Sequence, residues 1–490
     1  MASATIASPI MPPVQELTVS RTSAPALALP RVAVRHRVAL VIAGLTALTF
    51  LAPAAPTYDP WAWIIWGREV LHLDLSTVHG PSWKPLPVLL TTPFSLFGGL
   101  APDLWLFVAR AGTIAGVWFA FRLGRRLGGT PAGVAAAIPY ALAPWTLRNG
   151  ATGNSEGVLV ALAFAAVDRH LDGRDRAAFV LALGAALLRP EAWPFVGLYG
   201  LWLLWRRPAV RGLVVAGFAS LPALWLLPEW WGSGGLLRAM HRAQNPRADS
   251  PAFAENPVRA VLEQFASMFT PAVWVGLAAL VLAVFVRRPG RRELAVTGAL
   301  LLGALLWVVE VAVMTSDGFS GNIRYLVMPA AILCVAAGVG AGWLLRGLLG
   351  RRAAHGGLAA ALAVAVGAAF AAPAVHRVPA DVKAVTYQAR LNDNVAGLVA
   401  RAGGPARVRA CGQVHTGPFQ VPVVAWYTRL HTTQVSSLVP RRPAVVFRVR
   451  SNGAGRPVPS LRTLGDQADL RNLSVAPGWR IVGACRGGAA

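Results

Sequence analysis

The feature that most constrains this chain is the alternation of long apolar blocks with clusters of arginine. The blocks follow one another along residues 38–373, and the clusters lie at their ends. Only 14% of the 490 residues are charged and 55% are hydrophobic, whereas a soluble domain carries about 25% charged residues. A helix of about 20 apolar residues is long enough to cross a bilayer. The pattern therefore predicts an all-α polytopic membrane protein.

The arginine clusters also predict how the chain is threaded. We expect about 11 transmembrane helices, near residues 38–55, 104–122, 131–147, 155–167, 176–188, 193–206, 210–227, 268–286, 293–314, 324–346 and 356–373. With the N-terminus in the cytoplasm, five clusters fall on the cytoplasmic side: Arg122/Arg125/Arg126, Arg169/Arg174/Arg176, Arg206/Arg207/Arg211, Arg287/Arg288/Arg291/Arg292 and Arg346/Arg351/Arg352. Basic residues favour that side of a membrane. This threading makes the protein a multi-pass component of the plasma membrane.

Residues 1–37 are predicted to form a cytoplasmic tail. The first 30 residues are rich in Ala, Pro, Ser and Thr, a composition typical of disorder. Arg31, Arg35 and Arg37 follow them and favour retention of this end in the cytoplasm.

Residues 374–490 differ in composition from the membrane region. They are less apolar, rich in Arg, Gly and Pro, and contain short alternating stretches such as "VPVVAWY" and "PAVVFRVR". We expect a small extracytoplasmic C-terminal domain of α/β or mainly β character. Cys411 and Cys485 lie in it, where an oxidising compartment permits a disulfide. Two cysteines do not by themselves establish that they pair.

Residues 56–103 are predicted to form one large outer loop. If its apolar run 85–100 crossed the membrane, the cluster at 122–126 would be forced outside, and the three prolines of the run disfavour a straight span. The loop should contain interfacial helices, with Trp61, Trp63 and Trp66 at the level of the lipid headgroups. Asp59 precedes Pro60 and can start a helix as its cap. The same carboxylate can alternatively be a functional group.

Other polar residues gather in the later outer turns, which could converge on one cavity because all open toward the same side. The candidates are Glu156 after "LRNGATGNS", Arg189 and Glu191 in "LRPEAW", the stretch 228–250, and Arg324 in "TSDGFSGNIRY". Taken singly, each carboxylate is more simply a helix-terminal partner, with Asn154 or Ser155 as the cap before Glu156.

The formal net charge of +25 does not indicate a nucleic-acid-binding protein. Most arginines lie at the ends of apolar blocks, where topology and anionic headgroups explain them, and no zinc-finger spacing, phosphate loop or RNA-binding aromatic pattern is present in the sequence. No tight spacing of His and Asp requires a metal, so we expect no certain cofactor, and a divalent cation remains an option.

Two features of the first loop resemble the GT-C superfamily of membrane glycosyltransferases. One is an acid soon after the first membrane helix, and the other is "SWKPLPVLLTTPFSLFG", in which Trp83-Lys84-Pro85-Leu86 is similar to a Lys-Pro-Pro-Leu element. That element occurs in the branch with protein mannosyltransferases and the lipid A aminoarabinose transferase. Leucine stands here where the second proline is expected. The resemblance implies that a sugar moves, with inversion, from a polyprenyl-phosphate donor to an acceptor outside the membrane.

The resemblance also implies roles for individual residues. Asp59 matches the family's first-loop acid and would act as the base, and Lys84 matches its lysine and would contact the donor phosphate. Arg189 and Arg324 are further phosphate candidates from their predicted side of the membrane. Glu156 and Glu191 would orient sugar hydroxyls or supply an alternative base.

The partners expected are the lipid-linked donor, membrane lipids, and an envelope glycan, lipid or protein as acceptor. A transporter or flippase for a lipid-linked sugar or an envelope precursor is the alternative, although the sequence shows no internal repeat of the kind common in transporters. A third possibility is a scaffold that acts through the basic C-terminal domain, with Arg441, Arg442, Arg448 and Arg450.

Overall fold

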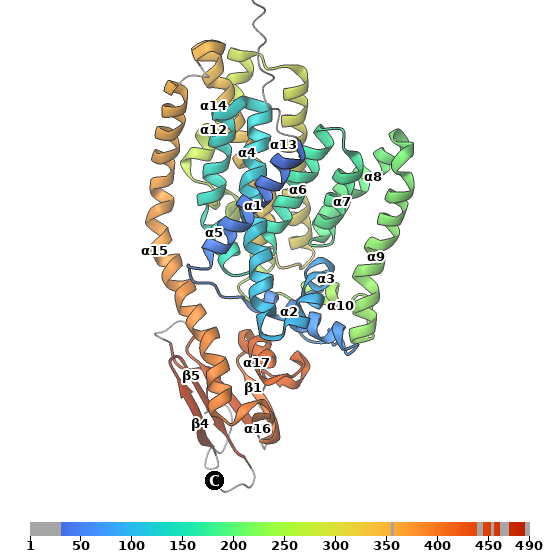
Figure 1. Ribbon diagram of the computed structural model, residues 1–490, viewed down its shortest axis with the longest axis vertical. Helices are drawn as coiled ribbons and strands as arrows, with labels where there is room; N and C mark the ends of the chain where they lie inside the picture. The colour runs from blue at the N-terminus through green and yellow to red at the C-terminus, as the bar shows by residue number, and fades with distance from the viewer. Residues whose placement is uncertain (1–30, 354–356, 439–443, 452–454, 461–469, 486–490) are drawn as a thin grey trace, which may run out of the picture. The chain divides into compact units, whose positions relative to one another are not determined.

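The helices of the membrane region follow the apolar blocks of the sequence. The computed structural model describes residues 31–353, 357–438, 444–451, 455–460 and 470–485, without the side chains of 31–35, 287 and 348–378 (Figure 1). The described residues from 42 onward pack as a single unit. The predicted disordered tail 1–30 and the arginines at 441 and 442 lie outside the described residues.

Fifteen helices make up the described chain as far as Arg401, apart from short 3₁₀ turns. They are α1 (Arg31–Thr49), α2 (Tyr58–Leu71), α3 (Pro85–Phe94), α4 (Ala101–Leu142), α5 (Pro144–Ala151), α6 (Glu156–Leu171), α7 (Asp175–Ala186), α8 (Trp193–Arg206), α9 (Arg211–Ser233), α10 (Arg238–Ala243), α11 (Pro257–Ser267), α12 (Pro271–Arg287), α13 (Arg291–Ser316), α14 (Val327–Ala353) and α15 (Gly357–Arg401). Each of the 11 predicted ranges overlaps one or two of them.

The helix lengths confirm a polytopic membrane protein and leave the number of crossings unconfirmed. Among residues with described side chains, four helical segments are long and apolar enough to cross a membrane, or six if the bent pairs α5/α6 and α11/α12 each make one span. Several predicted spans are shorter than the bilayer requires, such as α7 with 12 residues. The predicted count of 11 is therefore not established.

The centre of the membrane region is a close contact of α4 with α6 and α14. Glycines permit it: a Cβ on Gly112 would lie 2.7 Å from the Cα of Val158, and one on Gly338 would lie 2.4 Å from the backbone nitrogen of Ala136. Small residues at such positions let helix backbones approach within a bilayer. These contacts hold α6, whose first residue is Glu156, against α4.

The first loop folds into α2, α3 and the 3₁₀ turn η1 (Ser95–Leu100), and its tryptophans are buried. Trp61, Trp63 and Trp66 are 4%, 0% and 0% exposed. Rings of Trp63 and Trp105 lie 5.4 Å apart between centroids. The prediction that these tryptophans anchor the protein at the headgroups is wrong, because α3, α4 and the C-terminal domain cover α2.

The C-terminal domain is of α/β type, as predicted. Its five-stranded sheet has the order β2-β1-β3-β5-β4, from β1 (Gln413–Thr416), β2 (Val435–Ser436), β3 (Ala444–Val449), β4 (Arg471–Ala476) and β5 (Trp479–Gly483). Strand β1 runs parallel to β2 and β3, whereas β5 is antiparallel to β3 and β4. The stretch "VPVVAWY" forms helix α17 (Val421–Thr428) rather than a strand.

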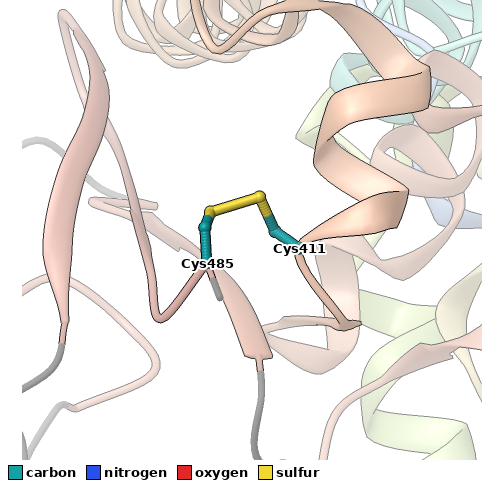
Figure 2. The surroundings of a disulfide bond; sticks show 2 residues. All are labelled: Cys411 and Cys485. Carbon is teal, nitrogen blue, oxygen red and sulfur yellow. A yellow bond between two sulfur atoms is a disulfide. The ribbon is translucent and has the colours of Figure 1, made fainter. Parts of the chain in front are cut away.

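Two further features concern the limits of this domain. Its predicted start at residue 374 falls inside α15, which runs from Gly357 to Arg401. Cys411, which follows α16 (Gly404–Ala410), forms a disulfide with Cys485 after β5, with their Cα atoms 4.4 Å apart (Figure 2). Cys334 is a buried free thiol in α14.

Candidate functional site

Four charged residues from distant parts of the chain form a continuous chain of ion pairs. Arg324 is its centre: Nη1 lies 3.0 Å from Asp59 Oδ2, and Nε lies 3.0 Å from Glu156 Oε1. Arg189 Nη2 also donates to Glu156 Oε1. The side chains of Glu156 and Arg189 are 0% and 4% exposed, whereas those of Asp59 and Arg324 are 24% and 22% exposed. The chain of ion pairs thus runs from the protein interior toward an accessible carboxylate.

Each member lies at the start of a helix or in a turn that leads into one. Asp59 lies in the first turn of α2 and Glu156 is the first residue of α6. Arg189 precedes the 3₁₀ turn Pro190–Ala192. Arg324 lies in the turn Ile323–Leu326, where the backbone N–H of Arg324 donates a hydrogen bond to the Asn322 side chain. Helix N-termini stabilise carboxylates, which helps to explain the positions of Asp59 and Glu156. The structure thereby brings together residues from four predicted outer segments.

Asp59 does not cap its helix. Helix α2 starts at Tyr58 with Thr57 as its N-cap, and no side chain completes that cap. Thr57 instead donates to Asn154 Oδ1 at 3.2 Å, which ties the start of α2 to the turn before α6. The predicted capping role of Asp59 is therefore wrong, and its Oδ2 is used by Arg324.

The turn before α6 also departs from the prediction. Ser155 occupies the N-cap position without a side-chain capping bond. Asn154 donates to Asn149 Oδ1 and Thr152 Oγ1, at 3.0 and 2.9 Å. Asn154 therefore stabilises the turn that presents Glu156 rather than the helix itself.

Lys84 lies beside this chain of ion pairs without joining it. It precedes α3, is 8% exposed, and places Nζ 5.1 Å from the centroid of the Trp63 ring. No acceptor among the described residues lies within hydrogen-bonding distance of Nζ. Burial, together with the positive charges of Arg189 and Arg324, lowers the pKa of Lys84 to about 7, against the attraction of nearby carboxylates such as Glu156. An anion placed beside these three cations would stabilise the ammonium form.

Glu191 and Tyr325 complete the surroundings of Arg189. Glu191 is 2% exposed, and its Oε1 lies 3.6 Å from Arg189 Nη1. The guanidinium carbon of Arg189 lies 4.7 Å from the centroid of the Tyr325 ring. Tyr325 was not among the predicted site residues, although its position next to Arg324 in the sequence was a usable signal.

Several buried polar atoms of the site lack a partner within the described part of the chain. They are Glu156 Oε2, Arg189 Nε, Glu191 Oε2 and Arg324 Nη2. Buried polar atoms are usually hydrogen-bonded, because leaving one unsatisfied costs about 1–3 kcal/mol. The two guanidinium donors add to Lys84 as unused capacity for binding an anion.

The donor set does not fit a divalent cation. Where side chains are described, no group of three or more His, Cys, Asp or Glu residues is arranged to hold a metal ion. Asp59 and Glu156 are already neutralised by guanidinium groups, whose positive charge would repel a cation.

Comparison with known proteins identifies the fold. No protein-family model and no curated protein matches the chain. The crystal structure of ArnT from Cupriavidus metallidurans bound to undecaprenyl phosphate matches over 93% of this chain and 98% of its own, with a TM-score of 0.54 and 14% identity. The apo structure of that ArnT matches over 92% and 97%, with a TM-score of 0.57 and 14% identity.

This likeness extends from the membrane helices through the C-terminal domain, since it covers nearly the whole length of both chains. At 14% identity it bears on architecture and not on individual side chains. The predicted fold is confirmed at the level of architecture: the chain has the fold of ArnT.

Proposed function

We propose that this protein is a glycosyltransferase that moves a sugar from a polyprenyl-phosphate-linked donor to a cell-envelope acceptor. The observation that carries the proposal is the placement of an accessible carboxylate, Asp59, within one cluster with three cations, Lys84, Arg189 and Arg324. Transfer from a lipid phosphate needs a group that takes a proton and cations that stabilise the departing phosphate. The match to ArnT with bound undecaprenyl phosphate supports a lipid phosphate as the donor's leaving group.

The transfer step uses these groups as follows. An acceptor hydroxyl oxygen forms a bond to the anomeric carbon from the face opposite the phosphate, which inverts the configuration. The bond between that carbon and the phosphate oxygen breaks, and the electron pair leaves with the polyprenyl phosphate. The hydroxyl proton passes to Asp59. Arg324 holds Asp59 through Oδ2, and Oδ1 has no protein partner among the described residues, so it can accept the proton.

The cations stabilise charge on the leaving phosphate. Among the described residues, Lys84 Nζ has no acceptor, and Arg189 and Arg324 each retain one buried guanidinium nitrogen, Nε and Nη2 respectively, without a partner. Charge-assisted hydrogen bonds to a phosphate would satisfy all three. Glu156 keeps the two guanidinium groups in place through Oε1, and Glu191 acts on Arg189 in the same way.

The acceptor approaches from the side of the membrane that holds the C-terminal domain. We propose that this side is extracytoplasmic, from the positions of the basic clusters and from the Cys411–Cys485 disulfide, which requires an oxidising compartment. We propose the corresponding division of the chain: a cytoplasmic tail over 1–37, a GT-C-like region over 38–373 with its outer loop 56–103, and an extracytoplasmic domain over 374–490.

The test is sugar transfer in membranes that contain the protein, with a panel of radiolabelled polyprenyl-phosphate sugars and envelope acceptors. We compare the wild type with Asp59→Asn, because asparagine keeps the shape but does not take a proton at neutral pH. The expected result is transfer by the wild type that falls by a factor of about 10² or more in the variant. Asp249→Asn, at a carboxylate 69% exposed in a surface pair, is the matched control.

Equal transfer by wild type and Asp59→Asn would remove Asp59 from the chemistry and leave Glu156 and Glu191 as the carboxylates to test. Movement of the labelled lipid across the membrane, with no transfer by the wild type, would overturn the proposal of an enzyme and support a flippase.

A further inference from the structure

Residues 77–83, which we call the approach segment, lead directly into Lys84 and are bound along their length by another part of the chain. Thr77, Ser82 and Trp83 each donate a hydrogen bond to a backbone carbonyl within residues 224–239, at 3.0 Å in every case. This partner region includes the end of α9 and the start of α10. The first loop is therefore anchored immediately before its predicted phosphate-binding residue.

Arg238 is the main side chain in this anchoring. Its Nη1 donates to the carbonyl of Pro81 at 2.8 Å, and its Nη2 donates to the carbonyls of Gly80 and Val78 at 3.2 and 3.4 Å. A single guanidinium thus holds three of the seven residues of the approach segment. Only the five-donor, planar group of arginine can make such a set of contacts.

Glu229 in turn holds Arg238. Its Oε1 lies 3.4 Å from Arg238 Nη1, and its Oε2 accepts from the Thr77 hydroxyl at 3.3 Å. The Glu229 side chain is 0% exposed and that of Arg238 is 13% exposed. A pair this buried is costly to leave incomplete, so its geometry is well defined.

Lys84 depends on its backbone for its position. Its ammonium has no hydrogen-bond acceptor among the described residues and lies over the Trp63 ring. The repulsion from Arg189 and Arg324 opposes the attraction of the nearby carboxylates, so charge alone does not fix its position. The chain after it is fixed by the bond from Leu86 N–H to the carbonyl of Leu187, at 3.2 Å. The chain before it is fixed by the approach segment.

We propose that Arg238, held by Glu229, is a positioning residue that keeps the Lys84 ammonium at the place where the lipid phosphate binds. This inference rests on the proposed function, specifically on phosphate binding by Lys84. Arg238 acts through the backbone of the approach segment and does not itself touch the substrate.

The first experiment is a double-mutant cycle on the binding of undecaprenyl phosphate to the purified full-length protein. Arg238→Gln is expected to weaken binding about tenfold in the wild-type background and less than about twofold in a Lys84→Ala background, because residues that act as one unit are not additive. Arg238→Lys keeps the positive charge but loses the planar guanidinium group, so its affinity should lie between those of the wild type and Arg238→Gln. Arg259→Gln, in an exposed pair with Glu263, is the control and should not change binding.

The second experiment reports on Lys84 without any ligand. The chain contains two lysines, Lys84 and Lys383, and Lys383 is exposed. The rate of acylation of Lys84 relative to Lys383, followed by mass spectrometry, should rise several-fold in Arg238→Gln and in Arg238→Lys, because the approach segment no longer holds Lys84 in place. An unchanged ratio in both variants would overturn the inference.

The binding results separate this inference from the proposed function. If Lys84→Ala binds as tightly as the wild type, the assigned role of Lys84 fails, and the inference fails with it. If Lys84→Ala weakens binding and Arg238→Gln does not, the function stands and the positioning role is wrong. Equal losses from Arg238→Gln in both backgrounds would show that Arg238 acts independently of Lys84.

Discussion

His431 Nδ1 lies 2.8 Å from Glu69 Oε1, and this contact joins the C-terminal domain to the helix that carries Asp59. The other ring nitrogen, Nε2, lies 2.9 Å from Asp74 Oδ2. The imidazole thus bridges two carboxylates of the first loop. A cavity of about 720 Å³ lies beside this bridge, lined in part by Arg68 and Trp426. His431 therefore joins the C-terminal domain to α2 and to the chain that follows it.

Removal of His431 should loosen this junction. In His431→Ala the buried carboxylate of Glu69 loses one of its two hydrogen-bond partners, the other being the backbone N–H of Ser76. We expect a loss of about 1–3 kcal/mol in the free energy of unfolding, seen as a lower Tm of the purified protein. His241→Ala, at an exposed position in α10, should leave Tm unchanged. Equal melting of His431→Ala and the wild type would show that the bridge contributes nothing to stability.

The stability of the protein should fall as pH rises from about 4.5 to about 7. Burial raises the pKa of Glu69 from 4.5 to about 7. Across this window the unfolded chain releases its proton while the folded protein keeps it, so the unfolded state binds fewer protons and is increasingly favoured. Glu69→Gln should remove this part of the pH dependence of Tm, whereas Glu255→Gln, at an exposed residue, should retain it. A profile in Glu69→Gln as steep as that of the wild type would contradict the assignment.

Binding of undecaprenyl phosphate should weaken as pH rises above about 7. Because the pKa of Lys84 is lowered to about 7, the free protein loses its ammonium in this range, while a phosphate monoester is already doubly charged above its second pKa of about 6. We expect a loss of affinity of about twentyfold between pH 7.5 and 9, following the fraction of protonated lysine. Lys84→Arg should bind with little pH dependence, because arginine stays charged. A wild-type affinity that is flat across this range would exclude Lys84 as the titrating group.

Much of the membrane architecture was predictable because the physical signal is strong. Long apolar blocks form helices in a bilayer, where backbone groups have no other partners. The resemblance selected Asp59, and the predicted side of the membrane selected Arg189 and Arg324; the structure brings these residues and Glu156 into one cluster. Their convergence was an expectation from the predicted topology. The individual ion pairs were not predictable, since each depends on the backbone path of a separate turn.

The surroundings of α2 were mispredicted, although the sequence contained a usable signal. Trp61, Trp63 and Trp66, together with Ile64 and Ile65, cover more than one face of the helix. A helix that is apolar on all sides is buried rather than interfacial. The tryptophans were assigned to the membrane interface from residue type. The distribution of the apolar side chains around the helix axis was the better indicator, because it predicts burial.

Helix α17 and the Arg238 contacts were not predictable from the sequence, for a different reason. The run "VPVVAWY" is short and continuously apolar, and such a run fits a buried helix as well as a strand. Arg238 binds backbone carbonyls of a loop about 160 residues earlier in the chain. No spacing of residues predicts such a contact, because every residue has a backbone carbonyl that can accept the hydrogen bond.

Reduction of the disulfide should destabilise the C-terminal domain. Cys411 and Cys485 are 74 residues apart in sequence, and a cross-link that closes a loop of this length contributes about 4 kcal/mol by its effect on the unfolded chain. Cys411→Ser with Cys485→Ser should make the domain more sensitive to limited proteolysis, as should treatment with a reductant. Cys334→Ser serves as the control, because Cys334 is a free thiol in α14. Proteolysis of the double variant at the wild-type rate would show that the cross-link does not stabilise the domain.

Glu156→Gln and Asp59→Asn should have different effects on stability, although both should lose transfer. Glu156 is fully buried and its Oε1 pairs with both Arg189 and Arg324, so Glu156→Gln leaves one buried and one half-buried guanidinium poorly compensated. Loss of one partner from a buried pair costs about 3–5 kcal/mol, and we expect a clear fall in Tm together with loss of transfer.

Asp59 is 24% exposed and its partner Arg324 retains Glu156, so Asp59→Asn should cost less than about 1 kcal/mol in stability while abolishing transfer. Parallel measurement of Tm and transfer rate separates the two roles. If Glu156→Gln melts like the wild type and still loses transfer, Glu156 rather than Asp59 becomes the candidate base.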